Sequence, residues 1–286
     1  MDLKKINMKQ IREFSRTSPI LFALGFTLLA ILVHEALATL LSLLPYSTWM
    51  ELLHELIFIL WPLALVLIFG FGFIFRQRGL RATIGAGLPS FLLFGMVLLG
   101  EMGTMASDPA TQWKSGPEIL LGIIMLIGVG FREEILYRGV VTNAIARKYA
   151  STTKGLWITV LSAGAMFGAI HLANAFNNIS FSGALAQALG SVGSGIFFCA
   201  VYLRGGSIWG MILLHSLMDA AGAAGVLFTN NAGDLSSLIS GYGFGLQEAI
   251  YIVIDLLVAA FLLRKSKQQK IFDRIQKLNA SEKANF

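Results

Sequence analysis

Apolar segments of about twenty residues recur along this chain, and few folds can accommodate them. A helix needs about 20 residues to cross the hydrocarbon core of a bilayer. Eight segments reach or approach that length, at residues 18–45, 52–75, 82–106, 117–146, 156–175, 183–203, 207–228 and 244–264. Only 13% of the 286 residues are charged and 56% are hydrophobic, whereas an average soluble domain has about 25% charged residues. The sequence therefore predicts an all-α, polytopic membrane bundle of about eight transmembrane helices.

The distribution of basic residues predicts how this bundle is oriented. Of the 22 Lys and Arg residues, 19 fall on one side of the expected helices and only Lys114 falls on the other, while Arg132 and Arg138 lie inside the fourth segment. Because cytoplasmic loops are enriched in Lys and Arg, we expect both termini in the cytosol. Topology and contact with anionic membrane lipids then account for the net charge of +6, and we expect no nucleic-acid partner.

We expect one transmembrane domain at residues 18–264, between basic cytosolic tails at residues 1–17 and 265–286. The first apolar segment is longer than a signal-peptide core of roughly 7–15 residues, which favours a retained helix. The second tail is either amphipathic or disordered. The small-residue runs Gly190–Gly195 and Ala220–Gly225 favour close packing between helices, and the single cysteine, Cys199, is expected to be buried.

Three groups of ionisable side chains interrupt these apolar segments. Such a side chain near the bilayer centre costs about 3 kcal/mol or more, so each group is a functional candidate. The groups lie in the fourth, fifth and seventh segments and comprise Glu133, Glu134 and Arg138; His171; and His215 with Asp219.

Residue spacing gives each group a geometry. Glu134 and Arg138 are four residues apart, so they share a helix face and can pair. Glu133 points about 100° away from Glu134 and is left without an ion pair. At 1.5 Å per residue, Glu133 and His171 both lie roughly 20 Å from the cytosolic end of their helices, and His215 lies roughly 16 Å from it. The three groups are therefore expected to meet at one depth.

This set of side chains favours hydrolysis. A carboxylate beside a histidine can take a proton from water, and donors on a neighbouring helix can stabilise the resulting oxyanion. The same set could hold zinc, with Glu133, His171 and His215 as ligands. Alternatively, each group has only a structural role and hydrogen-bonds a neighbouring helix, but three groups at matched depth favour a common site.

The three groups also form a familiar series of motifs. "EEILYR" fits E-E-x-x-x-R, "FGAIH" fits F-x-x-x-H and "HSLMD" fits H-x-x-x-[N/D], in this order on separate segments. The series resembles the CPBP family, also called the Abi family, which contains CAAX prenyl proteases and bacteriocin-processing enzymes. The resemblance covers roughly residues 117–228, which would form the catalytic core.

The resemblance implies an intramembrane endopeptidase. By its motifs, Glu133 would be the general base on a water that His171 helps to hold, and His215 and Asp219 would stabilise the oxyanion. The remaining motif residues, Glu134, Arg138 and Phe167, would support the site. Eukaryotic-type prenyl proteases carry Asn at the position of Asp219. Here Asp219 either is protonated in its buried setting or orients His215, which leaves His215 as the better oxyanion donor.

Several alternatives stay open at this level. The zinc pattern H-E-x-x-H is absent, because His34-Glu35 is followed by Ala38 and His54-Glu55 by Phe58. We therefore favour no cofactor, with zinc as the alternative. The expected partners are a hydrophobic or lipidated peptide and the lipids of a prokaryotic plasma membrane. A non-catalytic bacteriocin-immunity or peptide-binding protein is the second functional hypothesis. A transporter is the third, weakened by the lack of an evident inverted repeat.

Some intramembrane polar residues have no clear role in the motifs. Arg132 is expected to pair with another acid or with a substrate carboxylate. His34 and Glu35 either line the cavity or bond between helices. Glu101 and Asp255 are single acids without an evident partner.

Overall fold

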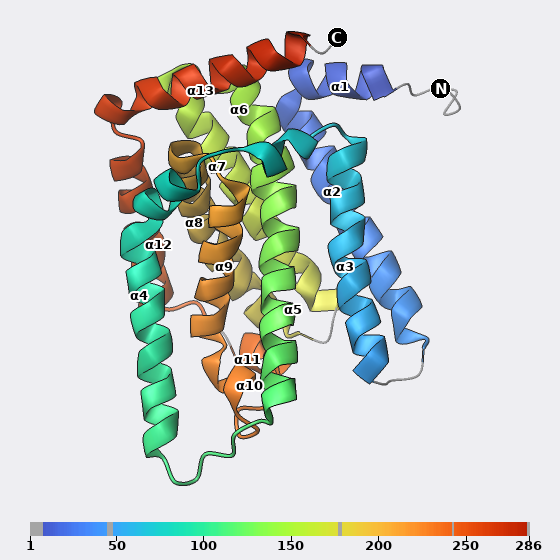
Figure 1. The fold of residues 1–286 in the computed structure, drawn as a ribbon, viewed down its shortest axis with the longest axis vertical. Coiled ribbons are helices and arrows are strands. Elements are labelled where there is room, and N and C mark those ends of the chain that lie inside the picture. The colour runs from blue at the N-terminus through green and yellow to red at the C-terminus, as the bar shows by residue number, and fades with distance from the viewer. Residues whose placement is uncertain (1–7, 45–47, 177–178, 242, 285–286) are drawn as a thin grey trace.

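Long apolar helices run side by side through most of the molecule (Figure 1). The computed structural model describes residues 8–44, 48–176, 179–241 and 243–284. Within those ranges no β-strand forms, and the one extended feature is an isolated bridge between Trp113 and Thr229. The predicted all-α fold class is confirmed.

The elements follow one another along the chain with short connections. They are α1 (Met8–Thr17), α2 (Pro19–Ser42), α3 (Thr48–Ile68), η2 (Gly72–Arg76), α4 (Leu80–Ser107), α5 (Gly116–Glu134), η3 (Ile135–Thr142), α6 (Asn143–Tyr149), α7 (Thr153–Ile170), η4 (His171–Phe176), α8 (Phe181–Gly205), α9 (Ile208–Gly222), α10 (Ala224–Phe228), α11 (Leu235–Ser240), α12 (Leu246–Leu262) and α13 (Lys265–Ala284).

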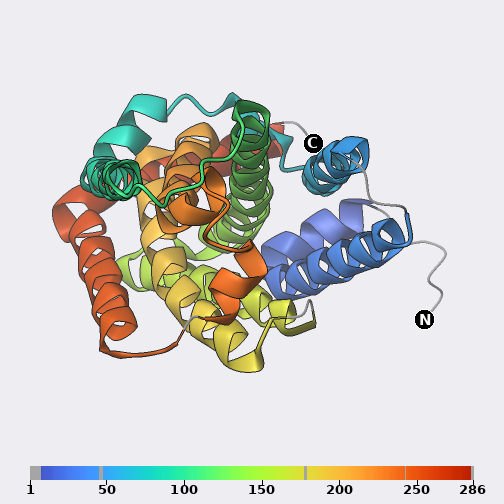
Figure 2. The ribbon, with the colours of Figure 1, turned by 90° about the horizontal axis from the view of Figure 1, so that it is seen from below.

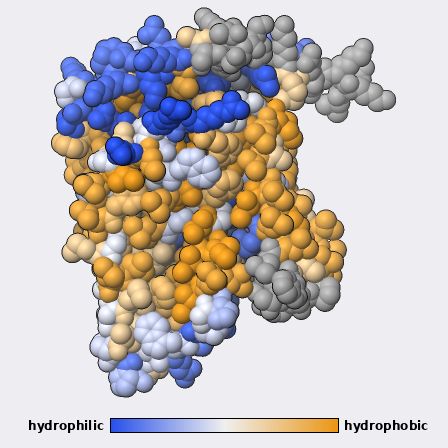
Figure 3. Space-filling model, viewed as in Figure 1, coloured by the Kyte–Doolittle hydropathy of each residue, from blue (hydrophilic) through white to orange (hydrophobic). Residues whose placement is uncertain are grey.

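Several helices have the length and composition of membrane spans. In the described residues these are α2, α4, α7 together with η4, and α8, and shorter apolar helices cover residues 53–68, 208–222 and 249–262. Hydrophobic residues cover the middle of the molecule, and hydrophilic residues gather at the end where α13 lies (Figure 3). These features are those of an integral membrane protein, and the exact number of spans stays a prediction.

Three expected segments change backbone conformation before their expected ends. Helix α3 ends at Ile68, because Gly70 takes a left-handed conformation (φ 81°) and the chain then turns into the 3-10 helix η2. The fifth segment changes to a 3-10 helix at His171, and the seventh changes from α9 to α10 after Gly222. Apolar composition continues across the breaks after Ile68 and Gly222, so hydropathy alone could not locate these two.

Both terminal helices lie across the hydrophilic end of the bundle (Figure 1). Helix α13 buries Ile271 and Ile275. On the same helix, Arg274 Nη2 donates to the carbonyls of Tyr202 (3.1 Å) and Leu203 (2.5 Å) near the end of α8. Of the two states expected for residues 265–286, the described part therefore adopts the amphipathic helix.

Helix α9 packs between α4 and α5 and also contacts α8 (Figure 2). Small residues bring some of these helices very close. A Cβ added to Gly195 of α8 would lie 3.0 Å from Gly164 Cα of α7, and one on Gly193 would lie 3.1 Å from Ile252 Cα of α12. The predicted close packing is therefore confirmed at these two glycines. Gly190 and Gly222 differ, since no described atom lies within 4 Å of such a Cβ.

Candidate active site

The two glutamates stand at the point where α5 becomes a π-helix. Helix α5 starts with a capping box between Ser115 and Glu118 and ends at Glu134. Every residue of the following π-helix η3 is buried. Asn143 Nδ2 donates to the carbonyls of Arg138 and Gly139, both at 2.9 Å, which satisfies carbonyl groups along the widened turn. π turns of this kind are frequent at functional sites.

Glu134 contacts both Arg138 and His215 through one oxygen. Its Oε1 lies 3.1 Å from Arg138 Nη1 and accepts a hydrogen bond from His215 Nδ1 at 2.7 Å. The side chains of Glu134, Arg138 and His215 are 0%, 1% and 3% exposed, so no solvent weakens these contacts. The predicted Glu134–Arg138 pair is confirmed. Sequence reasoning missed the bond to His215, although the matched depths of α5 and α9 pointed to it.

Two aromatic rings complete the surroundings of Arg138. Its guanidinium carbon lies 4.2 Å from the ring centre of Phe167 and 5.1 Å from that of Phe198. Rings at this distance attract a cation, most strongly when water is excluded. Phe167 thus packs on the guanidinium of Arg138, which in turn contacts Glu134. This contact gives a physical reason for the supporting role expected of Phe167.

The other nitrogen of His215 faces two acids. His215 Nε2 lies 3.7 Å from Glu133 Oε2 and 3.6 Å from Asp219 Oδ2. The side chains of Glu133 and Asp219 are 17% and 23% exposed, unlike the fully buried Glu134. The reachable side of the site is therefore the side on which Glu133, Asp219 and His215 Nε2 meet.

His171 approaches this group from the end of α7. Its Nδ1 lies 2.9 Å from the carbonyl oxygen of Phe167, so a proton on Nδ1 donates there and leaves the Nε2 lone pair free. Its ring packs edge-on against Phe167, with the centroids 5.1 Å apart. His171 also interacts electrostatically with Glu133. The apolar fifth segment predicted that His171 lies within a longer α-helix. Instead, His171 begins the 3-10 helix η4.

Close contact between α5 and α9 brings the glutamates to His215. A Cβ on Gly130 would lie 2.5 Å from Ser216 Oγ and 3.3 Å from the carbonyl oxygen of Ile212. Only glycine permits this approach one turn before the glutamates. The spacing of the two helices, and with it the 2.7 Å bond between Glu134 and His215, depends on this residue.

The donor types suit zinc but their arrangement does not. Glu133, His171 and His215 are side chains that bind zinc in proteins. Among the residues that the structure describes, however, no three His, Cys, Asp or Glu side chains are grouped to share one ion. His215 is instead enclosed by three carboxylates, with Nδ1 committed to Glu134.

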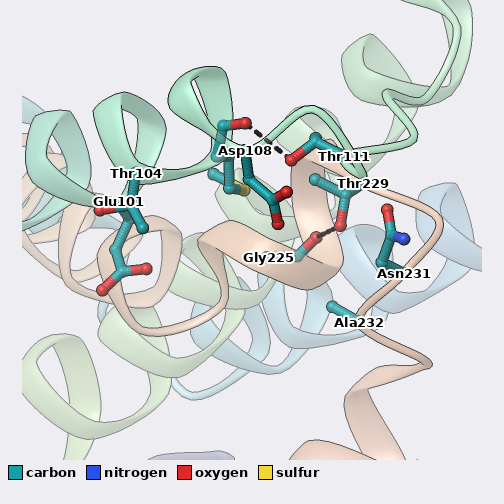
Figure 4. A pocket seen from close by; sticks show the side chains of 9 residues that line it. Glu101, Thr104, Asp108, Thr111, Gly225, Thr229, Asn231 and Ala232 are labelled. Atoms are coloured by element: carbon teal, nitrogen blue, oxygen red, sulfur yellow. Dashed lines mark hydrogen bonds between the residues drawn. The ribbon is translucent and has the colours of Figure 1, made fainter.

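A cavity of about 250 Å³ lies elsewhere, between the end of α4 and the segment after α10 (Figure 4). Its hydroxyl groups are engaged locally, since Thr111 donates to the Met105 carbonyl and Thr229 to the Gly225 carbonyl. Glu101, which the sequence left without a partner, lines this cavity. None of the predicted site residues does, so the cavity is separate from the candidate active site.

The fold and these side chains define a membrane-embedded helical protein with an interior site built from Glu, His, Asp and Arg. Residues 115–221 match the family model described as type II CAAX prenyl endopeptidase Rce1-like. The match covers all three motifs and confirms the family resemblance found in the sequence. At the level of the family it supports peptidase activity. No curated protein and no solved structure matches the chain.

Proposed function

We propose that the protein is an intramembrane endopeptidase that hydrolyses a peptide bond with a water activated by Glu133 and His171. The observation that carries the proposal is the position of His215, held by Glu134 on one nitrogen and facing Glu133 at 3.7 Å with the other. A histidine fixed in this way presents one chosen nitrogen to the reacting atoms.

Glu133 is the proposed general base. It is partly exposed and borders both histidines, so a water beside it can lose a proton to its carboxylate. The hydroxide then adds to the carbonyl carbon of the scissile bond. When the tetrahedral intermediate collapses, the C–N bond breaks and the proton moves from Glu133 to the leaving amine. His171 accepts a hydrogen bond from the water through its free Nε2.

His215 is the proposed oxyanion donor. Its Nε2 lies on the reachable side of the site, between Glu133 and Asp219. A hydrogen-bond donor aimed at the developing negative charge typically contributes about 10²–10³ in kcat. Asp219 assists in its protonated form, because only a carboxylic acid can donate to the oxyanion. Glu134, not Asp219, is the residue in position to orient His215.

The proposed substrate is a hydrophobic or lipidated peptide that reaches the site from the membrane, and the proposed reaction needs no metal. The apolar outer faces of the helices and the description of the matching family support this choice. A prokaryotic plasma membrane is part of the same proposal. The alternative is a non-catalytic protein of the same family that binds peptides or confers bacteriocin immunity.

Cleavage by purified protein in liposomes tests the proposal. The substrates are a prenylated CAAX peptide and a bacteriocin-type leader peptide, each with and without a chelator. The variants are Glu133→Ala, His171→Ala and His215→Ala, and the matched control is Glu101→Ala, which removes an exposed carboxyl group from α4. We expect wild type and Glu101→Ala to cleave at least one peptide and the three site variants to lose about 10²-fold or more.

Each outcome separates one alternative. If wild type binds a peptide and cleaves neither, the non-catalytic alternative holds. If the site variants cleave as well as wild type, the assigned residues are wrong. Loss of activity on chelation, restored by zinc, would contradict the metal-free mechanism.

A further inference from the structure

The side chain of Asn143 holds the backbone at the end of the π-helix η3. The backbone N–H of Asn143 donates to the carbonyl of Val140, whereas in a regular α-helix it would donate to the carbonyl four positions back, which belongs to Gly139. The side-chain amide of the same residue reaches that carbonyl instead, because Nδ2 donates to the carbonyls of both Arg138 and Gly139 at 2.9 Å. Asn143 is buried, so water does not compete for these bonds. The amide therefore stabilises the backbone where the pattern of an α-helix is interrupted.

Tyr202 of α8 connects this amide to another segment of the chain. Its hydroxyl oxygen accepts a hydrogen bond from Asn143 Nδ2 at 2.8 Å, and its O–H donates to Gln77 Oε1 at 2.9 Å. Gln77 follows η2, at a point where the backbone is extended. The two bonds run in the same direction from Asn143 to Gln77, and hydrogen bonds in such a series strengthen one another. The end of the π-helix is thereby attached to α8 and to the connection before α4.

A second contact with α8 lies beside the first. Thr142 Oγ1 and Cys199 Sγ are 3.5 Å apart. Cys199 and Tyr202 are three positions apart on α8, so they share a helix face. The side chains of all four residues in the two contacts are buried. One face of α8 therefore holds two consecutive residues at the end of η3, Thr142 and Asn143.

The anchored backbone carries residues of the candidate active site. The carbonyl of Arg138 is fixed by Asn143, and the guanidinium of Arg138 lies 3.1 Å from Glu134 Oε1. The same carboxylate oxygen accepts the hydrogen bond from His215. A shift of the backbone at Arg138 therefore moves the guanidinium that contacts Glu134, and with it the contact between Glu134 and His215.

We propose that Asn143 and Tyr202 are positioning residues, which keep the widened turn of η3 in place so that Glu133 and Glu134 face His215. Neither side chain supplies a proton or a charge to the reaction, and both act through the backbone that they hold. A misplacement of about 1 Å can lower the rate about 10²-fold, and loss of an interaction that is made only in the transition state lowers kcat without raising KM. This inference rests on the proposed function and adds two residues to it.

Steady-state cleavage of the peptide that wild type accepts tests both residues. Tyr202→Phe removes only the hydroxyl group, and we expect kcat to fall about tenfold, the upper range for one neutral hydrogen bond, with KM little changed. Asn143→Ala removes the bonds to both carbonyls and should lower kcat about 10²-fold. Asn143→Ser should recover part of this loss, because a serine hydroxyl can reach the carbonyl four residues back.

A double variant tests whether the two residues act as one group. If Tyr202 acts through Asn143, the double variant Asn143→Ala/Tyr202→Phe should lose no more activity than Asn143→Ala alone, because contacts within one network are not additive. Arg274→Ala is the matched control. It removes two hydrogen bonds to carbonyls in the same turn of α8 and leaves the Tyr202 hydroxyl in place. We expect it to lower the unfolding free energy without lowering kcat.

Nuclear magnetic resonance of ¹⁵N-labelled histidine reports on the site without any cleavage. The chain has four histidines, and the signals of His215 are those that His215→Ala removes. We expect Asn143→Ala and Tyr202→Phe to shift the His215 Nδ1 signal, because the ring no longer faces Glu134 in the same way. Arg274→Ala should leave this signal unchanged.

Several results would overturn the inference. These are an unchanged kcat in both Asn143→Ala and Tyr202→Phe, an equal loss of kcat in Arg274→Ala, or additive losses in the double variant. If wild type cleaves no peptide, the His215 signal decides. A shifted signal then supports the positioning role although the peptidase proposal fails, and an unshifted signal overturns both.

Discussion

Glu134 Oε1 and His215 Nδ1 lie 2.7 Å apart, and both side chains are almost completely buried. The bond connects the end of α5 with the middle of α9 across 81 positions of sequence. Because the same oxygen faces Arg138 at 3.1 Å, one carboxylate both balances the buried arginine and fixes the ring of His215. The stability of the fold and the orientation of the His215 imidazole therefore both depend on Glu134.

Replacing Glu134 tests this double role. Glu134→Ala leaves Arg138 as a buried cation without its acid, and breaking a buried pair in this way costs about 3–5 kcal/mol. Denaturant unfolding in detergent measures the loss. The double variant Glu134→Gln/Arg138→Met should be more stable than Glu134→Gln alone, because the second change removes the stranded charge. A double variant less stable than the single one would contradict the shared-carboxylate account.

Replacing Asp219 with Asn tests whether Asp219 acts as a hydrogen-bond donor or through its carboxylate charge. If Asp219 donates a proton to the oxyanion, Asp219→Asn should keep kcat within about tenfold of wild type, whereas Asp219→Ala should lose about 10²–10³. Steady-state cleavage of the peptide that wild type accepts measures both values. Equal loss in the two variants would instead mean that the carboxylate charge is required at His215 Nε2.

Gly130 sets the separation of α5 and α9. Gly130→Ala would place Cβ 2.5 Å from Ser216 Oγ, so we expect the helices to shift and destabilisation of about 1–3 kcal/mol from overpacking. Adding Ser216→Ala removes the nearest atom and should restore part of both stability and cleavage. Gly103→Ala on α4 is the control, since no described atom lies within 4 Å of the added Cβ. No recovery in the double variant would contradict the assigned clash.

Arg274 anchors α13 to the end of α8. Its two bonds to the carbonyls of Tyr202 and Leu203 predict that Arg274→Ala lowers the unfolding free energy by about 1.5–3 kcal/mol, the range for hydrogen bonds to a charged group. The exposed Lys277, one turn further along α13, is the matched control, and Lys277→Ala should change stability little. If Arg274→Ala and Lys277→Ala lower the unfolding free energy equally, the positive charge of α13, and not the contact of Arg274 with the two carbonyls, holds the helix in place.

Cysteine labelling measures the topology. Cys199 is buried, and Cys199→Ala gives a background for single cysteines. We expect the variants Ser151→Cys and Gln269→Cys to react with an impermeant maleimide from one side of the membrane. The variants Gln112→Cys and Asn231→Cys should react from the other side. Labelling of Ser151 and Asn231 from the same side would contradict the eight-span arrangement.

The sequence was informative where the physics is local. Hydropathy predicted the helices, and four-residue spacing predicted the Glu134–Arg138 pair, because helical geometry alone brings such residues together. The bond between Glu134 and His215 could not be predicted in atomic detail, since it depends on how closely α5 and α9 approach at Gly130. The 3-10 turn at His171 and the π-helix after Glu134 also could not be predicted, because small local differences in backbone hydrogen bonding decide them and hydropathy does not report such differences.

The number of residues in the π-helix Ile135–Thr142 determines how the two glutamates are oriented in the site. A π turn accommodates one more residue than an α turn. Loss of a single residue from this stretch would return the helix to α pitch and rotate the part that carries Glu133 and Glu134 by about 100° relative to the part anchored by Asn143. Glu134 would then turn away from His215 although every motif residue remained. We therefore expect a one-residue deletion between Gly139 and Thr142, outside the motif but inside the π-helix, to be as damaging as a substitution within the motif, although the motif residues themselves stay intact.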